Sequence, residues 1–218
     1  MCHLQDAINQ RHSIRQFTNK PVEKKMITKI VELAQRAPSW VNSQPWQVYC
    51  AMGDTLQAIK NAYRDQDIAG NQGNSDLPVM SREDWAPQTQ DNMKQWRHGI
   101  VHHFANFDEA HEKMTNASNT LYDSPVILYI TIPKASPDWS IFDAGLFAEN
   151  IMLAATAYGL GTIPTYNSVR FSAILHQTLN VPDDERFIVG ISLGYSADTT
   201  INSYHSERRP VNEILHFN

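Results

Sequence analysis

Two short arginine clusters lie near opposite ends of the sequence, and together they could bind a phosphate group. The first reads RHSIR and holds four candidate residues, Arg11, His12, Ser13 and Arg15. The second reads SERRP and holds Arg208 and Arg209. A guanidinium presents a planar fork of N–H donors that matches phosphate oxygens, and a serine hydroxyl adds one donor. Each cluster alone also fits a solvated basic turn, but the two together predict that both clusters bind the same phosphate group.

Two other segments are rich in groups that could meet a flat polar ligand. The segment APSWVNSQPW contains Ser39, Asn42 and Gln44, which can hydrogen-bond a polar ring or a ribityl chain. The same side chains could instead satisfy the backbone of a capped turn. In GLGTIPTYNS, Pro164 and Thr165 follow a glycine-rich helix end, where the backbone can approach a ligand closely.

Several other kinds of site lack their sequence patterns. There is no GxGxxG after a strand, no GxxxxGK[ST] and no GxSxG, so a Rossmann site, a P-loop and a serine hydrolase are not supported. His98 and His102 have the i, i+4 spacing of metal ligands. Because no HExxH or third ligand accompanies them, we expect surface histidines and no metal site.

The composition is that of one globular domain. The chain has 218 residues, 42% of them hydrophobic and 19% charged, and a net charge of −5. An acidic chain of this kind is not expected to bind nucleic acid or an anionic membrane surface, because both require a basic surface.

The compartment is also predicted from the sequence. Cys2 and Cys50 form no CxxC motif, the N-terminus has no signal-peptide pattern, and no apolar run reaches the ~18 residues of a membrane span. We therefore expect a cytoplasmic protein.

The elements that must position these residues follow an α+β order. Amphipathic or apolar helices are predicted over residues 22–37 and 168–182, and from residue 138 to the YGLG at 158–161, where Gly159 and Gly161 would be C-caps. Another helix is predicted over residues 54–65, with Asp54 or Thr55 as its N-cap. Strands are predicted over 45–53, 125–133 and 186–196, the second of them buried on both faces. Because the strands do not alternate regularly with helices, we expect helices flanking a mostly antiparallel sheet. Residues 65–119 contain few aliphatic side chains, and we interpret them as an insertion that forms a lid.

Four segments taken in order resemble the motifs of the nitroreductase family of FMN-dependent oxidoreductases. They are RHSIRQF with KPV, APSWVNSQPW, AENIMLAATAYGLGTIPT and ERRPVNEIL, which together cover most of the chain outside residues 65–119. The resemblance implies a mixed, mainly antiparallel sheet between helical layers. It also implies a homodimer that exchanges terminal segments and holds FMN at the subunit interface.

The resemblance assigns roles to the candidate residues. Arg11 and Arg208 would bind the FMN phosphate, with His12 and Ser13 beside it, and the spacing to Pro210 favours Arg208 over Arg209. Arg15 would lie near the N1–O2 edge of the flavin, where a cation stabilises the anionic reduced ring. The residues that would reach the FMN of the other subunit are Pro38, Ser39, Trp40 and Asn42. Pro164 and Thr165 would line the flavin N5 side.

The implied activity is a ping-pong oxidation–reduction with no protein catalytic residue. NADH or NADPH would reduce FMN, and a nitroaromatic or quinone-like acceptor would then be reduced in the same site. Heterocycle oxidation, reductive dehalogenation and flavin breakdown on the same fold are alternatives, as is a flavin-binding protein with little turnover. Trp40 departs from the family pattern, which commonly has a small residue there, so it would narrow the cleft or stack over part of the cofactor.

Overall fold

A four-stranded antiparallel sheet forms the centre of the molecule. The computed structural model describes residues 3–218. The strands are β1 (Gln47–Met52), β2 (Val126–Pro133), β3 (Gly161–Thr165) and β4 (Glu185–Gly194). Their spatial order is β1-β2-β4-β3, so β2 and β4 are central and β1 and β3 lie at the edges. The predicted α+β class with a mainly antiparallel sheet is confirmed.

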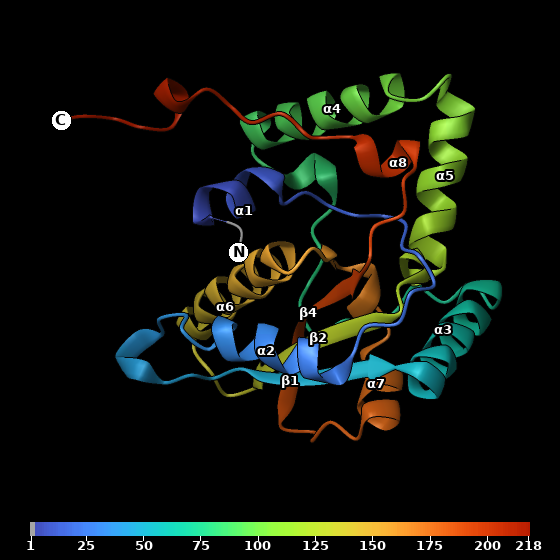
Figure 1. Cartoon of the computed structure of the whole chain (residues 1–218), viewed down its shortest axis with the longest axis vertical. Helices are drawn as coiled ribbons and strands as arrows, with labels where there is room; N and C mark the ends of the chain where they lie inside the picture. The colour runs from blue at the N-terminus through green and yellow to red at the C-terminus, as the bar shows by residue number, and fades with distance from the viewer. Residues whose placement is uncertain (1–2) are drawn as a thin grey trace.

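Helices cover both faces of this sheet (Figure 1). They are α1 (Leu4–Gln10), α2 (Lys24–Ala34), α3 (Gly53–Ile68), α4 (Pro87–His102), α5 (Phe107–Asn119), α6 (Asp138–Ala157), α7 (Ser172–Leu179) and α8 (Thr200–Ser203). Side chains of α2 and α6 share one core with β2 and β4, and side chains of α3 and α7 form a second core on the opposite face. Every residue of β2 except the terminal Pro133 is buried, as its apolar sequence predicts.

The local structure differs from the sequence prediction at two places. Residues 161–165 form an edge strand, β3, which was not among the predicted strands. Pro164 is tolerated there because an edge strand has one side on which no backbone donor is needed. Helix α3 begins at Gly53, so Met52 is its N-cap, not Asp54 or Thr55. Gly53 has a φ of +56°, which turns the chain from β1 directly into the helix.

Residues 65–119 contain the end of α3 and the helices α4 and α5. Ile100, Phe104 and Ala110 of this segment form a small apolar cluster with Ile201 of α8. The C-terminal segment therefore packs on the segment that was expected to be an insertion, and Figure 1 shows α4 and α5 beside α8. Within residues 3–218, no helix is both long enough and apolar enough to cross a membrane. The cellular compartment stays a prediction.

Candidate functional site

Asn202 joins the two ends of the chain at the site. Its Oδ1 accepts hydrogen bonds from the backbone N–H groups of Arg15 (2.7 Å) and Gln16 (3.1 Å). Its Nδ2 donates to the carbonyl oxygens of Gln16 (2.6 Å) and Ala197 (2.9 Å). The segment around residue 15 is thereby fixed to the C-terminal segment, so side chains almost 190 positions apart in sequence share one cavity.

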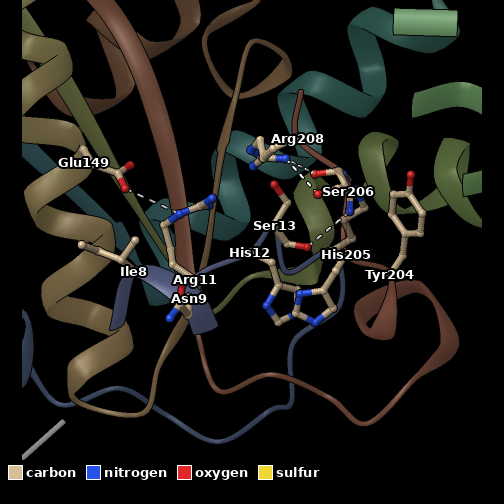
Figure 2. A pocket seen from close by; sticks show the side chains of 11 residues that line it. Ile8, Asn9, Arg11, His12, Ser13, Glu149, Tyr204, His205, Ser206 and Arg208 are labelled. Atoms are coloured by element: carbon tan, nitrogen blue, oxygen red, sulfur yellow. Dashed lines mark hydrogen bonds and ion pairs between the residues drawn. The ribbon is translucent and has the colours of Figure 1, made fainter. Parts of the chain in front are cut away.

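That cavity has a volume of about 390 Å³, within the range of roughly 300–1,000 Å³ that small-molecule sites occupy. It is lined by Ile8, Asn9, Arg11, His12, Ser13, Arg15, Glu149, Tyr204, His205, Ser206 and Arg208. Five of these residues were predicted from the two arginine clusters. Figure 2 shows the labelled arginines, Ser13 and Ser206 arranged around the same space.

The arginines of the cavity differ in their partners. Arg11 lies 3.6 Å from a carboxylate oxygen of Glu149 on α6. Arg208 donates to the carbonyl and hydroxyl oxygens of Ser206 at 3.0 and 2.7 Å. Arg209 does not line the cavity, and its Nε donates instead to the Glu213 carboxylate at 3.0 Å. Of the two neighbouring arginines, Arg208 is therefore the one available to a ligand in the cavity.

Arg15 is a buried cation without a carboxylate partner among residues 3–218. Only 9% of the residue is exposed, and its guanidinium donates to the carbonyl oxygen of Ser13 at 3.3 Å. The Trp96 ring of α4 lies 6.0 Å from the guanidinium carbon. Burial lowers the pKa of Arg15, while the Tyr122 and Tyr204 hydroxyls oppose that shift. A buried charge is costly unless it is paired, so this position suits a ligand that carries negative charge.

Residues 38–44 do not line this cavity. The backbone N–H of Trp40 donates to the buried Asp143 carboxylate at 3.1 Å, and Ser39 Oγ accepts from the Gln44 N–H at 3.0 Å. These hydrogen bonds agree with the interpretation of the segment as a capped turn. The backbone is nevertheless unusual, because Val41, Asn42 and Gln44 all have positive φ values, of 45°, 58° and 44°. Left-handed backbone at non-glycine residues, and above all at a β-branched valine, costs free energy and is typical of functional loops.

Trp40 and its neighbours form an exposed aromatic group. Trp40 is 55% exposed and meets the edge of Trp139 at a ring distance of 6.0 Å, and Trp139 packs in the same manner on Phe142. Pro38 precedes this group and, like Ser39 and Asn42, does not line the cavity.

Pro164 and Thr165 lie on β3, next to the segment that carries the first arginine cluster. The backbone N–H of Ile14 donates to the carbonyl oxygen of Thr162 at 3.0 Å, which ties that segment to the strand. Pro164 is exposed, whereas Thr165 is buried and its hydroxyl bonds to that of Ser168. The Thr165 side chain thus caps the turn that follows β3, and neither residue lines the cavity.

The comparisons with known proteins settle the family. A family model described as Nitroreductase family matches residues 8–195. The chain belongs to the nitroreductase family. This nitroreductase-family chain is 29% identical over 215 residues to a 4-nitrobenzoate reductase of Pseudomonas putida, with 97% of the chain and 93% of that protein covered. It is 28% identical over 221 residues to a chloronitrobenzene nitroreductase of Comamonas testosteroni, with 98% and 96% covered.

Solved structures agree on the nitroreductase fold. An FMN- and NADPH-dependent nitroreductase, NfnB, from Sphigopyxis sp. strain HMH superposes with a TM-score of 0.90 at 23% identity, covering 100% of this chain and 99% of that one. NfnB of Mycobacterium smegmatis, in complex with NADPH, gives a TM-score of 0.89 at 23% identity, covering 98% and 97%. The family and the fold expected from the four motifs are therefore confirmed.

Several residues at this cavity are absent from the sequence-based prediction. They are Glu149, Tyr204, His205 and Ser206 in the cavity lining, Asn202 behind it, and Tyr122 near Arg15. Tyr204, His205 and Ser206 lie within four positions of Arg208, so the second arginine cluster indicated their region of the sequence but not their roles. Asn202 had no local sequence signal, because its partners are distant in the chain.

Proposed function

We propose that the protein is an FMN-dependent oxidoreductase that uses NADH or NADPH to reduce nitroaromatic or quinone-like acceptors. The observation that carries this proposal is Arg15, which is buried and has no carboxylate partner among residues 3–218, in a cavity that Arg11 and Arg208 also line. The names of the relatives support the acceptor class, since they include a 4-nitrobenzoate reductase and a chloronitrobenzene nitroreductase.

The donor set fits the phosphate and ring of a flavin nucleotide. Arg11 and Arg208 would bind the phosphate, with Ser13 and His12 beside it, because these groups line the cavity and can donate hydrogen bonds. Arg15 would face the electron-rich edge of the ring, where its fixed charge favours reduction. When bound, FMN supplies the redox chemistry by accepting a hydride from NADH or NADPH and passing it to the acceptor, in two half-reactions at one site.

We propose further that the working unit is a homodimer. Residues 38–42 lie outside the cavity of their own protomer, and their left-handed backbone is stabilised by Asp143 of α6. In the proposed dimer Pro38, Ser39, Trp40 and Asn42 reach the flavin of the partner. Pro164 and Thr165 are proposed to lie on the flavin N5 side, by backbone approach from β3. Residues 65–119 would act as a lid of the single domain, which the contact between Trp96 and Arg15 supports.

An anaerobic titration tests the activity. Purified protein supplied with FMN should be yellow, lose its flavin absorbance when NADPH or NADH is added, and regain it when a nitroaromatic is added. A yellow protein that neither nucleotide bleaches would contradict the oxidoreductase proposal. Protein that cannot take up FMN would contradict the site itself.

A matched pair of arginine variants tests the phosphate assignment. Arg208→Ala should weaken FMN binding by on the order of 1.5–3 kcal/mol, roughly ten- to a hundredfold, because a charge-assisted contact is lost. Arg209→Ala is the control, since the Arg209 guanidinium is engaged by Glu213. Arg11→Ala should act like Arg208→Ala. If Arg11→Ala and Arg208→Ala both bind FMN with wild-type affinity by fluorescence titration, the phosphate lies elsewhere.

A further inference from the structure

The ring of His12 contacts two groups that can only accept hydrogen bonds. Its Nδ1 lies 2.8 Å from the carbonyl oxygen of Gln10, and its Nε2 lies 2.8 Å from the carbonyl oxygen of Asn202. A neutral imidazole has one N–H and can donate to only one of these oxygens, whereas an imidazolium donates to both. An acceptor oxygen is therefore already in place for a second N–H on the His12 ring.

The second histidine of the cavity supports this assignment. The rings of His12 and His205 are in contact, with centroids 3.9 Å apart and planes tilted by 33°, at one side of the cavity in Figure 2. Burial, followed by the proximity of His12 and His103, lowers the pKa of His205. Both causes disfavour a positive charge on the His205 ring.

The other charges around this pair are mainly positive. The titratable and charged groups that face it or lie close by are Arg11, Arg15 and Arg208, the hydroxyl of Tyr204, the ring of His103, and the carboxylates of Glu149 and Glu207. Glu149 lies against Arg11, and Glu207 lies near Tyr204. An imidazolium at His12 therefore adds a further cation to a cavity that already holds several, and an anion in the cavity would compensate for it.

We propose that binding of a phosphate monoester in this cavity is coupled to uptake of one proton from solvent by His12. The inference rests on the proposed function, because the FMN phosphate is the anion concerned. The bound dianion stabilises the imidazolium, and the carbonyl oxygens of Gln10 and Asn202 receive its two N–H groups. Since the complex holds one more proton than the separate partners, affinity for the cofactor falls as the pH rises.

Calorimetry tests the coupling directly. FMN should be titrated into the cofactor-free protein at pH 7.5, in phosphate-free buffers with different ionisation enthalpies. At this pH the free phosphate is already mainly dianionic, because its second pKa is about 6. The dependence of the observed enthalpy on the buffer should give an uptake approaching about one proton for FMN. Riboflavin, which has the same ring and no phosphate, should give none.

A histidine variant provides the second measurement. The dissociation constant of FMN should rise with pH in the wild-type protein, by at most about tenfold per pH unit, the limit for one linked proton. His12→Gln should remove most of this dependence, whereas His111→Gln should keep it, because His111 stacks on Phe107 in α5 away from the cavity. Nitrogen NMR of the wild-type complex should show both His12 ring nitrogens protonated and His205 neutral, which makes the test independent of whether the variant folds.

The outcomes separate this inference from the proposed function. FMN binding without proton uptake, together with one unprotonated nitrogen on His12, would overturn the coupling and leave the flavin site intact. Failure of FMN to bind at all would overturn both. Equal proton uptake with riboflavin would also refute the inference, because the proton would then be linked to the ring system and not to the phosphate.

Discussion

Arg15 holds its positive charge in a position that solvent hardly reaches, 9% exposed and beside the Trp96 ring. Replacement with the neutral Arg15→Gln should lower the reduction potential of bound FMN, because negative charge on the reduced ring would lose its nearest fixed cation. We expect a shift on the order of 30 mV or more, since 30 mV corresponds to about 1.4 kcal/mol for two electrons. Potentiometric titration of the wild-type and variant proteins measures it.

Arg15→Lys is the matched variant for this prediction. Arg15→Lys keeps the positive charge and loses only the planar fork of donors. The reduction potential of bound FMN should therefore lie between those of Arg15→Gln and the wild-type protein. Equal potentials in the wild-type protein and Arg15→Gln would show that the guanidinium does not lie at the ring edge.

Asn202 is the residue whose loss should affect both folding and binding. In Asn202→Ala the N–H groups of Arg15 and Gln16 lose their acceptor, and a buried unpaired polar group costs about 1–3 kcal/mol. We expect the free energy of unfolding in urea to fall by a few kcal/mol, and FMN affinity to fall with it. Asn119→Ala, at the exposed end of α5, should change stability by less than about 0.5 kcal/mol. Similar unfolding curves for the two variants would argue against the role of Asn202 in joining the chain ends.

At the scale of elements, strand β3 supports the segment that carries the first arginine cluster. A Cβ added at Gly161 would lie 2.5 Å from the Ile14 side chain, so Gly161→Ala must displace Ile14 and the arginines on either side of it. Overpacking of this kind typically costs about 1–3 kcal/mol. We expect a lower unfolding midpoint and weaker FMN binding.

Gly145→Ala in α6 is the control for the added methyl group. A Cβ at Gly145 meets nothing within 4 Å, and alanine is the better helix former. The unfolding midpoint of Gly145→Ala should equal or exceed that of the wild-type protein. If Gly161→Ala binds FMN as the wild-type protein does, the contact between β3 and Ile14 does not position the arginines.

The elements also show what periodicity can and cannot predict. The sequences of α2, α6 and β2 carry strong hydrophobic patterns, and each element forms within a few residues of its expected bounds. Strand β3 was missed because GTIPT is short and contains proline, and its pairing with β4 is a tertiary contact. The arginine clusters could be identified from the sequence because arginine and serine side chains can donate hydrogen bonds to phosphate in any fold. Asn202 acquires its role only when residues near both ends of the chain meet, which no local pattern encodes.

At the scale of the whole molecule, the exposed apolar side chains favour association of two chains. Large apolar groups lie exposed on α1, around Trp40, at the start of α6 and in the C-terminal segment, at Leu4, Ile8, Trp40, Val41, Trp139, Phe142, Val211, Ile214, Leu215 and Phe217. Figure 1 shows the C-terminal segment extending away from the sheet. Surfaces of this kind typically mark interfaces.

Sedimentation equilibrium should therefore give twice the chain mass of 24.8 kDa. The unfolding temperature should rise with protein concentration, because dissociation accompanies unfolding of a dimer. Removal of residues 210–218 should weaken the dimer. A monomeric mass together with a concentration-independent unfolding temperature would contradict the homodimer and the assignment of Trp40 to the flavin of the partner.

The meeting of residues 11–15 with residues 202–208 also has a consequence for biosynthesis. The first arginine cluster leaves the ribosome long before its Asn202 anchor and the Arg208 side of the cavity, because Asn202 is translated 187 residues after Arg15. Such long-range contacts cannot form on a nascent chain, and loop closure over most of the polypeptide makes them late events in folding. Cofactor loading should accordingly begin only after residues 202–208 have left the ribosome, so a ribosome-stalled chain that stops before residue 202 should bind no FMN.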